Sequence, residues 1–260
     1  MNKLSCDRLC RPDCPWTPEL LEEIDSTNAE LKRRPGAPEG TVLVTARQSA
    51  GRGRLGRQFS SPPGGVYLSA VLRPDAPPER LLHLTPMVAV AMRRALLDAC
   101  GADCGIKWIN DLVFRGKKLC GILVELHEGA VIVGVGVNCN TPPEAFPPEV
   151  HAMATTLRDA VGAPVDPNAV ASAMTRRLWL LSQELFSKKA EYLAEYAAHC
   201  VTLHQPVQLL RGQTREEAFA EGIDENGALL VRRADGTRSA VQAGEVSVRG
   251  LYGYASGASS

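Results

Sequence analysis

Short apolar runs rich in strand-forming residues recur through the first half of this chain. They lie at 20–25, 41–45 and 66–72. A fourth run, 131–140, alternates valine with glycine and asparagine, so its side chains fall on two different faces of a strand. These runs predict the strands of a buried sheet.

Longer segments show apolar residues at helical spacing. Between 79 and 100 the spacing predicts a core helix, which Pro86 either breaks or begins. Two more helices are expected near 168–188 and 189–200, where aliphatic and aromatic residues recur at the same spacing. At 260 residues the chain is long enough to bury a full core, and its length suggests one or two domains.

A short helix is predicted at 28–34. Thr27 followed by Glu30 has the spacing of a capping box, and Pro35 ends the helix. Two interpretations of Ser26 and Thr27 stay open at this point. They either only cap the helix, or they also bind a ligand.

The pattern changes after about residue 203, where short strands alternate with turn-forming residues. Such strands are predicted at 207–210, 218–222, 228–232 and 246–249. They suggest a small β-barrel-like second domain. We therefore expect four parts, namely a flexible leader at 1–17, a first domain at 18–202, a second domain at 203–253 and a disordered tail at 254–260.

Composition argues against a nucleic-acid or membrane partner. Basic and acidic residues number 29 each, so the formal net charge is zero and the whole protein has no electrostatic footprint for DNA or an anionic membrane. No apolar run approaches the roughly 18 residues of a membrane span, and residues 1–16 lack the apolar centre of a signal peptide. We expect a cytoplasmic protein.

Eight cysteines are scattered along the chain without a C-x-x-C pair, so free thiols are expected. Cys6, Cys10 and Cys14 repeat every four residues, which would bring three thiols to one face of a helix as metal ligands. Pro12 and Pro15 argue against that helix, and three ligands are few for a metal site. No residue is assigned as a certain metal ligand.

The stretch 51–59, Gly-Arg-Gly-Arg-Leu-Gly-Arg-Gln-Phe, carries three arginines and three glycines without an acidic residue. Glycine tolerates positive φ and arginine donates bidentate hydrogen bonds to phosphate or carboxylate, so the expected partner is an anion. A solvated basic loop or an RNA-binding Arg-Gly segment would show the same pattern. The residues also fit the dinucleotide pattern G-x-G-x-x-G, but Ser-Ser-Pro-Pro-Gly-Gly at 60–65 cannot form the helix which that pattern needs. We reject the NAD interpretation.

A strand, a turn and a second strand are predicted over 106–125. Its polar residues stand among apolar neighbours, at Lys107, Asn110, Asp111 and Lys118. Gly121 inside the second strand leaves room for the close approach of another group. A surface hairpin without any function would show the same pattern.

The alternation at 131–140 gives its strand one unusual face, formed by Gly134, Gly136 and Asn138. This face is smooth and then bears an amide, which suits a flat ligand whose edge the amide reads. Close packing of a helix on the glycines is the alternative, above all at Gly134.

Five motifs together resemble those of biotin–protein ligases in order and spacing. They occupy 26–28, 48–59, 107–111, 118–125 and 134–138. The resemblance runs from about residue 21 to residue 250, because 222–231 and 243–249 look like that family's C-terminal SH3-like domain. The combination is specific, although no single motif is.

The resemblance implies an α/β (α+β) fold with a mixed-sheet catalytic domain and a small C-terminal SH3-like β-barrel. It also implies that the biotin carboxylate attacks the α-phosphate of ATP, giving biotinyl-AMP and pyrophosphate. A lysine of the biotin carboxyl carrier protein of acetyl-CoA carboxylase, or of a related carboxylase, would then attack the adenylate. Because the first step joins two anions, cationic side chains and Mg²⁺ would be needed.

The resemblance also implies roles for individual residues. Biotin would contact Ser26, Thr27, Gln48, Gly51, Arg52, Arg54, Lys118 and Gly121. ATP and the adenylate would contact Arg52, Arg54, Arg57, Phe59, Lys107, Asn110 and Asn138. Catalysis would fall to Arg54, Lys118 and Asp111, and Asp111 would receive the acceptor lysine. Two positions depart from the family pattern, since Phe59 stands where Trp is usual and Ile109 where Pro is usual.

Two other classes stay open. Lipoate and octanoyl transferases share the fold and the acyl-transfer logic, but their ligand-binding loops lack the Gly-Arg-Gly-Arg-x-Gly-Arg arrangement. The second class is a non-enzymatic biotin-sensing regulator. The zero net charge and the fewer than 20 residues before the catalytic domain argue against it, since a helix-turn-helix domain would not fit there. The sequence is compatible with a homodimer.

Overall fold

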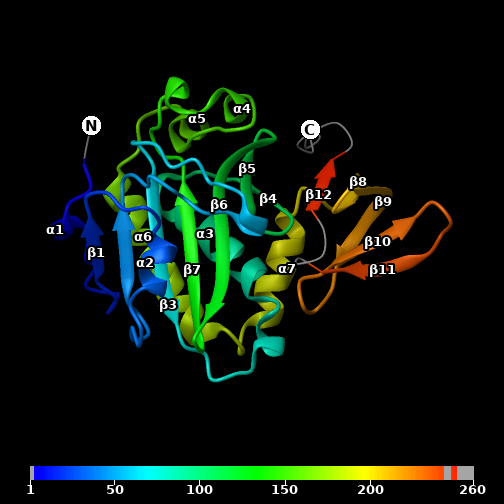
Figure 1. The fold of residues 1–260 in the computed structure, drawn as a ribbon, viewed down its shortest axis with the longest axis horizontal. Helices are drawn as coiled ribbons and strands as arrows, with labels where there is room; N and C mark the ends of the chain where they lie inside the picture. The colour runs from blue at the N-terminus through cyan, green and yellow to red at the C-terminus, as the bar shows by residue number, and fades with distance from the viewer. Residues whose placement is uncertain (1–2, 243–246, 251–260) are drawn as a thin grey trace.

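The computed structural model describes residues 3–242 and 247–250, with the side chains of 247–250 left aside. Within these residues the chain forms a seven-stranded sheet and a separate five-stranded sheet (Figure 1). In the first sheet the spatial order is β1-β2-β3-β7-β6-β5-β4. Only β1 and β2 pair in parallel, and all other neighbours are antiparallel, so the mixed sheet of the expected fold class is confirmed.

The strands of the first sheet follow the predicted apolar runs closely in the middle of the sheet and less closely at its edges. Their bounds are β1 Pro18–Leu21, β2 Val42–Thr45, β3 Val66–Leu72, β4 Gly105–Lys107, β5 Asp111–Phe114, β6 Lys117–His127 and β7 Ala130–Val137. In β7 the valine face joins the main hydrophobic core, as the alternation predicted. The glycine face looks to the other side of the sheet.

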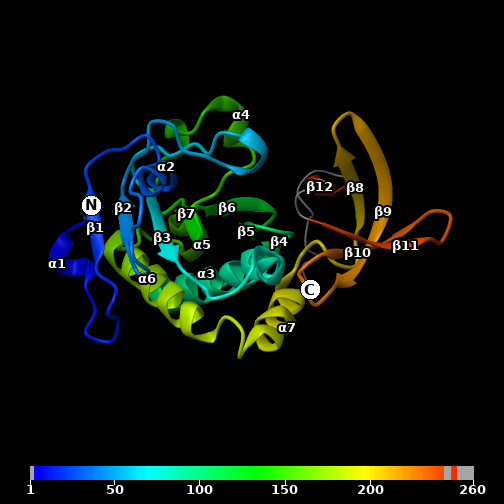
Figure 2. The ribbon, with the colours of Figure 1, turned by 60° about the horizontal axis from the view of Figure 1, so that its bottom comes forward.

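Helices cover both faces of this sheet. Their bounds are α1 Cys6–Leu9, α2 Thr27–Lys32, α3 Leu84–Cys100, α4 Pro148–His151, α5 Leu157–Val161, α6 Pro167–Glu184 and α7 Lys189–His199. The long helices α3 and α6 lie along one face, while the short α2 lies on the other, beside β3 and β7 (Figure 2). This unequal covering leaves space over the glycine face next to α2. No helix of the described residues is long and apolar enough to cross a membrane.

Helix α3 decides between the two predicted effects of Pro86. The helix begins at Leu84, so Pro86 lies in its first turn, where a missing N–H costs no helical hydrogen bond. A separate 3₁₀ turn, Pro78–Leu81, precedes it. Gly101 in the left-handed conformation, φ 72°, ends the helix. Pro86 therefore marks the true start of the helix, not a break.

Residues 3–17 pack on the first domain, which differs from the flexible leader predicted for 1–17. Leu9 is 1% exposed and belongs to the main core. Arg8 pairs with Asp166 at 2.6 Å, and the Ser5 N–H donates to Asn168 Oδ1 at 2.8 Å. The four-residue helix α1 ends before Pro12, so one buried leucine and these polar contacts attach the segment to α6.

The second sheet has the order β11-β10-β9-β8-β12 and is antiparallel throughout. Its strands are β8 Pro206–Arg211, β9 Thr214–Ile223, β10 Leu229–Arg233, β11 Arg238–Val241 and β12 Ser247–Gly250. Strand β11 was not predicted, because Arg-Ser-Ala-Val carries only one strong strand former. Among the described residues the ladders do not close this sheet into a barrel. The predicted tail, 254–260, lies outside the described residues.

Trp108 joins the two sheets. Its indole Nε1–H donates to the Gly227 carbonyl at 3.0 Å, and its backbone N–H donates to Thr202 Oγ1 at 3.0 Å. A Cβ on Gly227 would come within 2.5 Å of Pro86 on α3. The β9–β10 turn is thus pressed against the first domain.

Because His83, the residue before α3, is buried, we predict that the stability of the protein depends on pH. It is 2% exposed, and burial lowers its pKa, assisted by Lys189, while a hydrogen bond with the Leu185 backbone opposes this. In the unfolded chain the pKa is about 6.5, so the unfolded state takes up the proton first. The free energy of unfolding should therefore fall as the pH drops below about 6.5.

Urea denaturation between pH 5 and pH 8 tests this prediction. His83→Gln keeps an amide donor for Leu185 but does not titrate, so its stability should change less over this range than that of the wild type. An equal change in both proteins would assign the pH dependence to other groups.

Candidate ligand-binding site

A cavity of about 660 Å³ opens over the glycine face of the first sheet. Its walls come from the start of α2, from the arginine loop at 51–59, from the β4–β5 connection, from β6 and β7, and from residues 146–154. It contains almost all of the side chains that the sequence assigned to a site. The exception is Gly51, which does not line it.

The arginine loop is a short hairpin. Gly53 N–H donates to the Arg57 carbonyl at 2.7 Å, and Phe59 N–H donates to the Gly51 carbonyl at 2.9 Å. Its tip is a 3₁₀ turn, Arg54–Gly56, in which Leu55 has a φ of 56°. A Cβ on Gly51 would collide with the Phe59 carbonyl and with Ser61 Oγ, so Gly51 is required by the closure of the hairpin.

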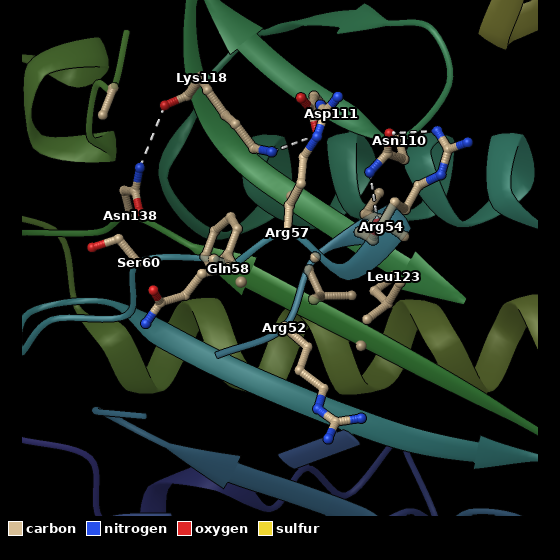
Figure 3. Close-up of a pocket in the computed structure, with 18 of the residues that line it drawn as sticks. Arg52, Arg54, Arg57, Gln58, Ser60, Asn110, Asp111, Lys118, Leu123 and Asn138 are labelled. Atoms are coloured by element: carbon tan, nitrogen blue, oxygen red, sulfur yellow. Dashed lines mark hydrogen bonds and ion pairs between the residues drawn. The ribbon is translucent and has the colours of Figure 1, made fainter. Parts of the chain in front are cut away.

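The three arginines of the loop do not point the same way (Figure 3). Arg54 and Arg57 reach toward Asn110 and Asp111, whereas the exposed Arg52 runs in the opposite direction, away from Lys118. The structure therefore brings two of the three predicted guanidiniums together and keeps the Arg52 side chain apart.

Arg54 and Lys118 place cationic groups beside the strand β5. Arg54 Nη1 donates to Asn110 Oδ1 at 3.2 Å, and Lys118 Nζ lies 2.7 Å from Asp111 Oδ1. Asn110 is itself held by the hydrogen bond from its Nδ2 to the Ile122 carbonyl at 2.8 Å. Burial lowers the pKa of Arg54, while Asp111 acts in the opposite direction. Two cationic side chains in one cavity wall are suited to binding a carboxylate or a phosphate.

Phe59 occupies the floor of the cavity. A Cβ on Gly121 would lie 2.6 Å from the Phe59 ring, and a Cβ on Gly136 would collide with the same ring. Lys118 Nζ lies 5.3 Å from the ring centroid, within the range of a cation–π interaction. The flat group on this face is therefore a side chain of the protein, at the very position where Gly121 was expected to admit a ligand.

Gly134 follows the alternative prediction of close helix packing. A Cβ at this position would collide with the side-chain amide of Asn28 from helix α2. The space above Gly134 is thus filled by a buried polar side chain. The open part of the cavity lies over the arginine loop and β6.

The start of α2 corrects one prediction. Ser26, not Thr27, is the N-cap, because its Oγ accepts from the Ala29 N–H at 3.4 Å. Glu30 pairs with Arg33 and Arg34 instead of completing a capping box. Thr27 is the first helical residue, so its hydroxyl is available for other contacts.

Thr27 and Gln48 meet at one end of the cavity. The Thr27 N–H donates to Gln48 Oε1 at 2.8 Å, and Thr27 Oγ1 lies 3.1 Å from the same oxygen. Gln48 Nε2 donates to Ser61 Oγ at 2.9 Å. This polar end is uncharged, in contrast to the cationic cluster around Lys118.

Asn138 provides an unused acceptor in the cavity wall. Its Nδ2 donates to the carbonyl of Thr155 at 3.0 Å and to that of Lys118 at 3.4 Å (Figure 3). Its Oδ1 is buried and has no partner among the described residues. A ligand that offers an N–H donor there would satisfy it. Lys107 also lines the cavity, at the end of β4.

The sequence did not identify residues 146–154 as part of a site. The stretch 141–148 is proline-rich and has the composition of a loop, yet Phe146 and, after it, Val150 and Met153 line the cavity. The Lys118 N–H donates to the Met153 carbonyl at 2.7 Å, and Thr155 N–H donates to the Lys118 carbonyl at 2.9 Å. These backbone contacts carry no sequence signal, so pattern analysis could not have found them.

The structure gives no support to the cysteine-based metal hypothesis. Within the described ranges, no three His, Cys, Asp or Glu side chains gather as a metal site. Cys6 and Cys10 are exposed whereas Cys14 is buried, and all eight cysteines are free thiols.

The chain resembles known proteins over most of its length. Residues 20–141 match the biotin/lipoate A/B protein ligase family, and residues 202–249 match the biotin protein ligase C terminal domain. A biotin–[acetyl-CoA-carboxylase] ligase of Paracoccus denitrificans is 34% identical, over 87% of this chain and 98% of its own length. A bifunctional ligase/repressor BirA of Bacillus subtilis is also 34% identical, over 85% of this chain and 70% of its own length.

One solved structure extends the comparison to the fold. It is that of a biotin protein ligase from Aquifex aeolicus in complex with biotin and ATP, with a TM-score of 0.79 and 32% identity. The match covers 90% of this chain and 98% of the other.

Gly136→Ala should test the packing of Phe59 on the sheet. The added methyl collides with the ring, and such overpacking costs about 1–3 kcal/mol of unfolding free energy. In a Phe59→Leu background the same substitution should cost less, because the smaller side chain can move away. Chemical denaturation of the four proteins in this double-mutant cycle measures the coupling. Strictly additive effects would show that the ring does not rest on Gly136.

Proposed function

Because this chain belongs to the biotin/lipoate A/B protein ligase family, we propose that it activates biotin with ATP and transfers it to a lysine of a biotin carboxyl carrier protein. The observation that carries the proposal is the division of one cavity into an uncharged polar end and a cationic end. Biotin has the same division, with a ureido ring at one end and a carboxylate at the other. The relatives named as biotin ligases agree with this assignment.

The cationic cluster would serve the first step. A carboxylate oxygen of biotin attacks the α-phosphorus of ATP, the bond to the β-phosphate bridging oxygen breaks, and pyrophosphate leaves. Carboxylate and phosphate repel each other at close range, so fixed positive charge at this point lowers the barrier. Lys118 and Arg54 would supply it, and Asp111 and Asn110 hold their head groups in position.

The uncharged end would bind the ureido ring of biotin through the Thr27 hydroxyl and the Gln48 amide. Ser26 also lines the cavity there, although its hydroxyl already caps α2. The backbone of Gly51 and Arg52 would close the site from the hairpin side. Gly121 would contribute indirectly, because it admits the Phe59 ring on which the ligand would rest.

The nucleotide would extend from Asn138 toward the β4–β5 connection. The unpaired Asn138 Oδ1 suits the amino group of adenine, and Phe59 offers an aromatic ring beside it. Lys107, Asn110 and Arg57 line the part of the cavity where the phosphates would lie, and Arg52 would join them only by turning from the direction that its side chain takes here. Mg²⁺ would enter with ATP, held mainly by phosphate oxygens, and neutralise the charge of the leaving pyrophosphate.

Asp111 would serve the second step. The acceptor lysine has an ordinary pKa near 10.4 and must lose a proton before its amine attacks the adenylate carbonyl. The Asp111 side chain is 17% exposed, so an incoming amine can reach it. The amide bond forms, AMP leaves with the oxygen, and the proton passes by way of the carboxylate.

The other two classes fit less well. A lipoate or octanoyl transferase would not need an N–H-binding polar end, and the match of residues 202–249 is to a domain described for biotin protein ligases. A purely sensory protein would not need the Lys118–Asp111 pair. We further propose that the enzyme works in the cytoplasm, where ATP is available and its eight thiols stay reduced.

A reconstituted reaction tests the function directly. The purified chain, biotin, MgATP and a biotin carboxyl carrier domain should yield a carrier whose mass has increased by one biotinyl group, together with pyrophosphate. Omission of any one reactant should abolish the product. Lipoate or octanoate supporting the same rate would refute the assignment to biotin.

Lys118→Ala should slow formation of the adenylate. Loss of one cationic contact to a developing oxyanion costs about 3 kcal/mol, or roughly a hundredfold in the rate of pyrophosphate release. Lys117→Ala is the matched control, because this exposed neighbour on the same strand lies outside the cavity. Equal rates for the two variants would remove Lys118 from the reaction.

Asp111→Asn should slow transfer more than activation. The amide cannot accept the proton of the lysine, so transfer from supplied biotinyl-AMP to the carrier should fall by roughly a hundredfold, the scale of general-base effects. Single-turnover mixing of preformed biotinyl-AMP with enzyme and carrier measures this step. Normal transfer under these conditions would contradict the role of Asp111.

A further inference from the structure

A chain of hydrogen bonds runs behind the uncharged end of the cavity, from Glu125 to Thr27. Asn28 Nδ2 lies 2.9 Å from Glu125 Oε2, Ser69 Oγ lies 2.5 Å from Asn28 Oδ1, and Thr27 Oγ1 lies 2.6 Å from Ser69 Oγ. Ser69 is fully buried, and Thr27 and Asn28 are 3% and 4% exposed. We call these four residues the Glu125 relay. None of the roles assigned so far uses its first three members.

The chemistry of the groups fixes the direction of the first hydrogen bond. An ionised carboxylate can only accept, and so can the Leu123 carbonyl, which lies 3.4 Å from Asn28 Nδ2. The amide nitrogen of Asn28 must therefore face Glu125, which turns its oxygen toward Ser69. That oxygen can only accept, so Ser69 must donate its one hydroxyl proton to Asn28.

The same reasoning continues to the cavity. With its own proton committed, Ser69 can only accept from Thr27, and Thr27 donates its single hydroxyl proton away from the cavity. Gln48 is fixed independently, because its Oε1 accepts from the Thr27 N–H and its Nε2 donates to Ser61. Thr27 Oγ1 is also within hydrogen-bond distance of Gln48 Oε1, at 3.1 Å, but a hydroxyl has one proton, and the shorter contact with Ser69 at 2.6 Å takes it. Two acceptors at this distance are unfavourable until a donor binds to both.

We infer that the negative charge of Glu125, acting through Asn28 and Ser69, holds Thr27 and Gln48 as a pair of acceptors that selects a ligand N–H. Under the proposed function, on which this inference rests, the donor is a ureido N–H of biotin. Glu125 is a positioning residue in this scheme, since it does not line the cavity. It makes the site specific for a donor at a place where a free threonine could accept or donate.

Two further features of the structure favour the charged form of Glu125. Lys32 Nζ lies 2.6 Å from Glu125 Oε1, with both side chains about one-quarter exposed. Burial raises the pKa of Glu125, but the hydrogen bonds from Lys32 and Asn28 outweigh it, so the pKa lies below its ordinary value. Gly134 contributes space, since any side chain there would displace the Asn28 amide.

Glu125→Gln should reverse the relay without changing its shape. Lys32 keeps the oxygen of the new amide on its own side, so the amide nitrogen faces Asn28 and forces the Asn28 amide to turn over. Asn28 then donates to Ser69, Ser69 donates to Thr27, and Thr27 donates to Gln48. The acceptor pair is lost, and the dissociation constant for biotin should rise roughly tenfold or more, while that for ATP stays unchanged.

Lys32→Gln is the matched control, because it breaks the same ion pair but leaves the carboxylate in place. Its affinity for biotin should stay within about twofold of the wild type. Isothermal titration calorimetry with biotin and with ATP measures both variants, and thermal unfolding checks that they fold. Equal biotin affinities for Glu125→Gln and Lys32→Gln would overturn the inference.

Ser69→Ala interrupts the relay at a residue that does not contact Lys32. Thr27 must then turn its proton to Gln48, so biotin affinity should again fall while ATP affinity stays unchanged. Unchanged biotin affinity in Ser69→Ala would also overturn the inference. If Glu125→Gln fails to fold, the measurement on Ser69→Ala decides the question.

Ligands provide the complementary experiment. Two cyclic carbamate analogues of biotin each have a ring oxygen in place of one ureido N–H. Each analogue therefore lacks one of the two N–H donors of the ring. For the analogue that lacks the selected donor, wild type and Glu125→Gln should differ in affinity much less than they do for biotin. If the full difference persists with both analogues, the relay does not select a donor. Absence of any biotin binding by the wild type would instead refute the proposed function.

Discussion

Three glycines on one face of β6 and β7 are the constraint on which the site depends. Gly121 and Gly136 let the Phe59 ring lie directly on the backbone, and Gly134 does the same for the Asn28 amide. With any larger residue the hairpin at 51–59 and helix α2 would have to move away from the sheet. These glycines therefore set the distance between the arginine loop and the sheet, and with it the depth of the cavity.

The two ends of the cavity differ in charge. At one end the cations of Arg54 and Lys118 lie beside the neutral amide of Asn110 and the carboxylate of Asp111. Near the opposite end, Glu125 and Lys32 pair with each other behind the wall. The polarity of the cavity thus matches a molecule that is neutral at one end and anionic at the other.

The sequence predicted the centre of the fold better than its edges. Residues 66–72 and the valine face of β7 were identified because apolar periodicity is strong where both sides of a strand are buried. The N-cap was assigned to Thr27 in place of Ser26, since two capping residues in succession cannot be distinguished by spacing. Packing of residues 3–17 includes long-range contacts such as that of Ser5 with Asn168, which lies 163 residues away. Contacts of that range leave no local signal.

The candidate site was also predicted only in part. Residue types and their spacing indicated the pairing of polar groups near Lys118, but not the direction in which each arginine points, because that depends on the turn at Leu55. Phe59 was expected to contact the adenylate. Its ring packs on Gly121 and Gly136, which become neighbours only when β6 pairs with β7, so the sequence alone does not show this contact. Residues 146–154 reach the cavity through backbone hydrogen bonds, which any sequence can make.

The contact between Trp108 and Gly227 also constrains how this chain can evolve. Every described residue that lines the cavity lies between Ser26 and Ala154, yet the indole that forms part of its wall finds its hydrogen-bond acceptor in the second sheet. That acceptor is a backbone carbonyl, so the second sheet can change nearly all of its side chains without losing the contact. Gly227 itself cannot be substituted, because it has a φ of 81° and lies too close to Pro86 for a side chain. Recombination could therefore exchange the second sheet between distant lineages as long as this turn was inherited intact. A gene shortened before residue 203 would keep the described residues that line the cavity but would leave the indole without this acceptor.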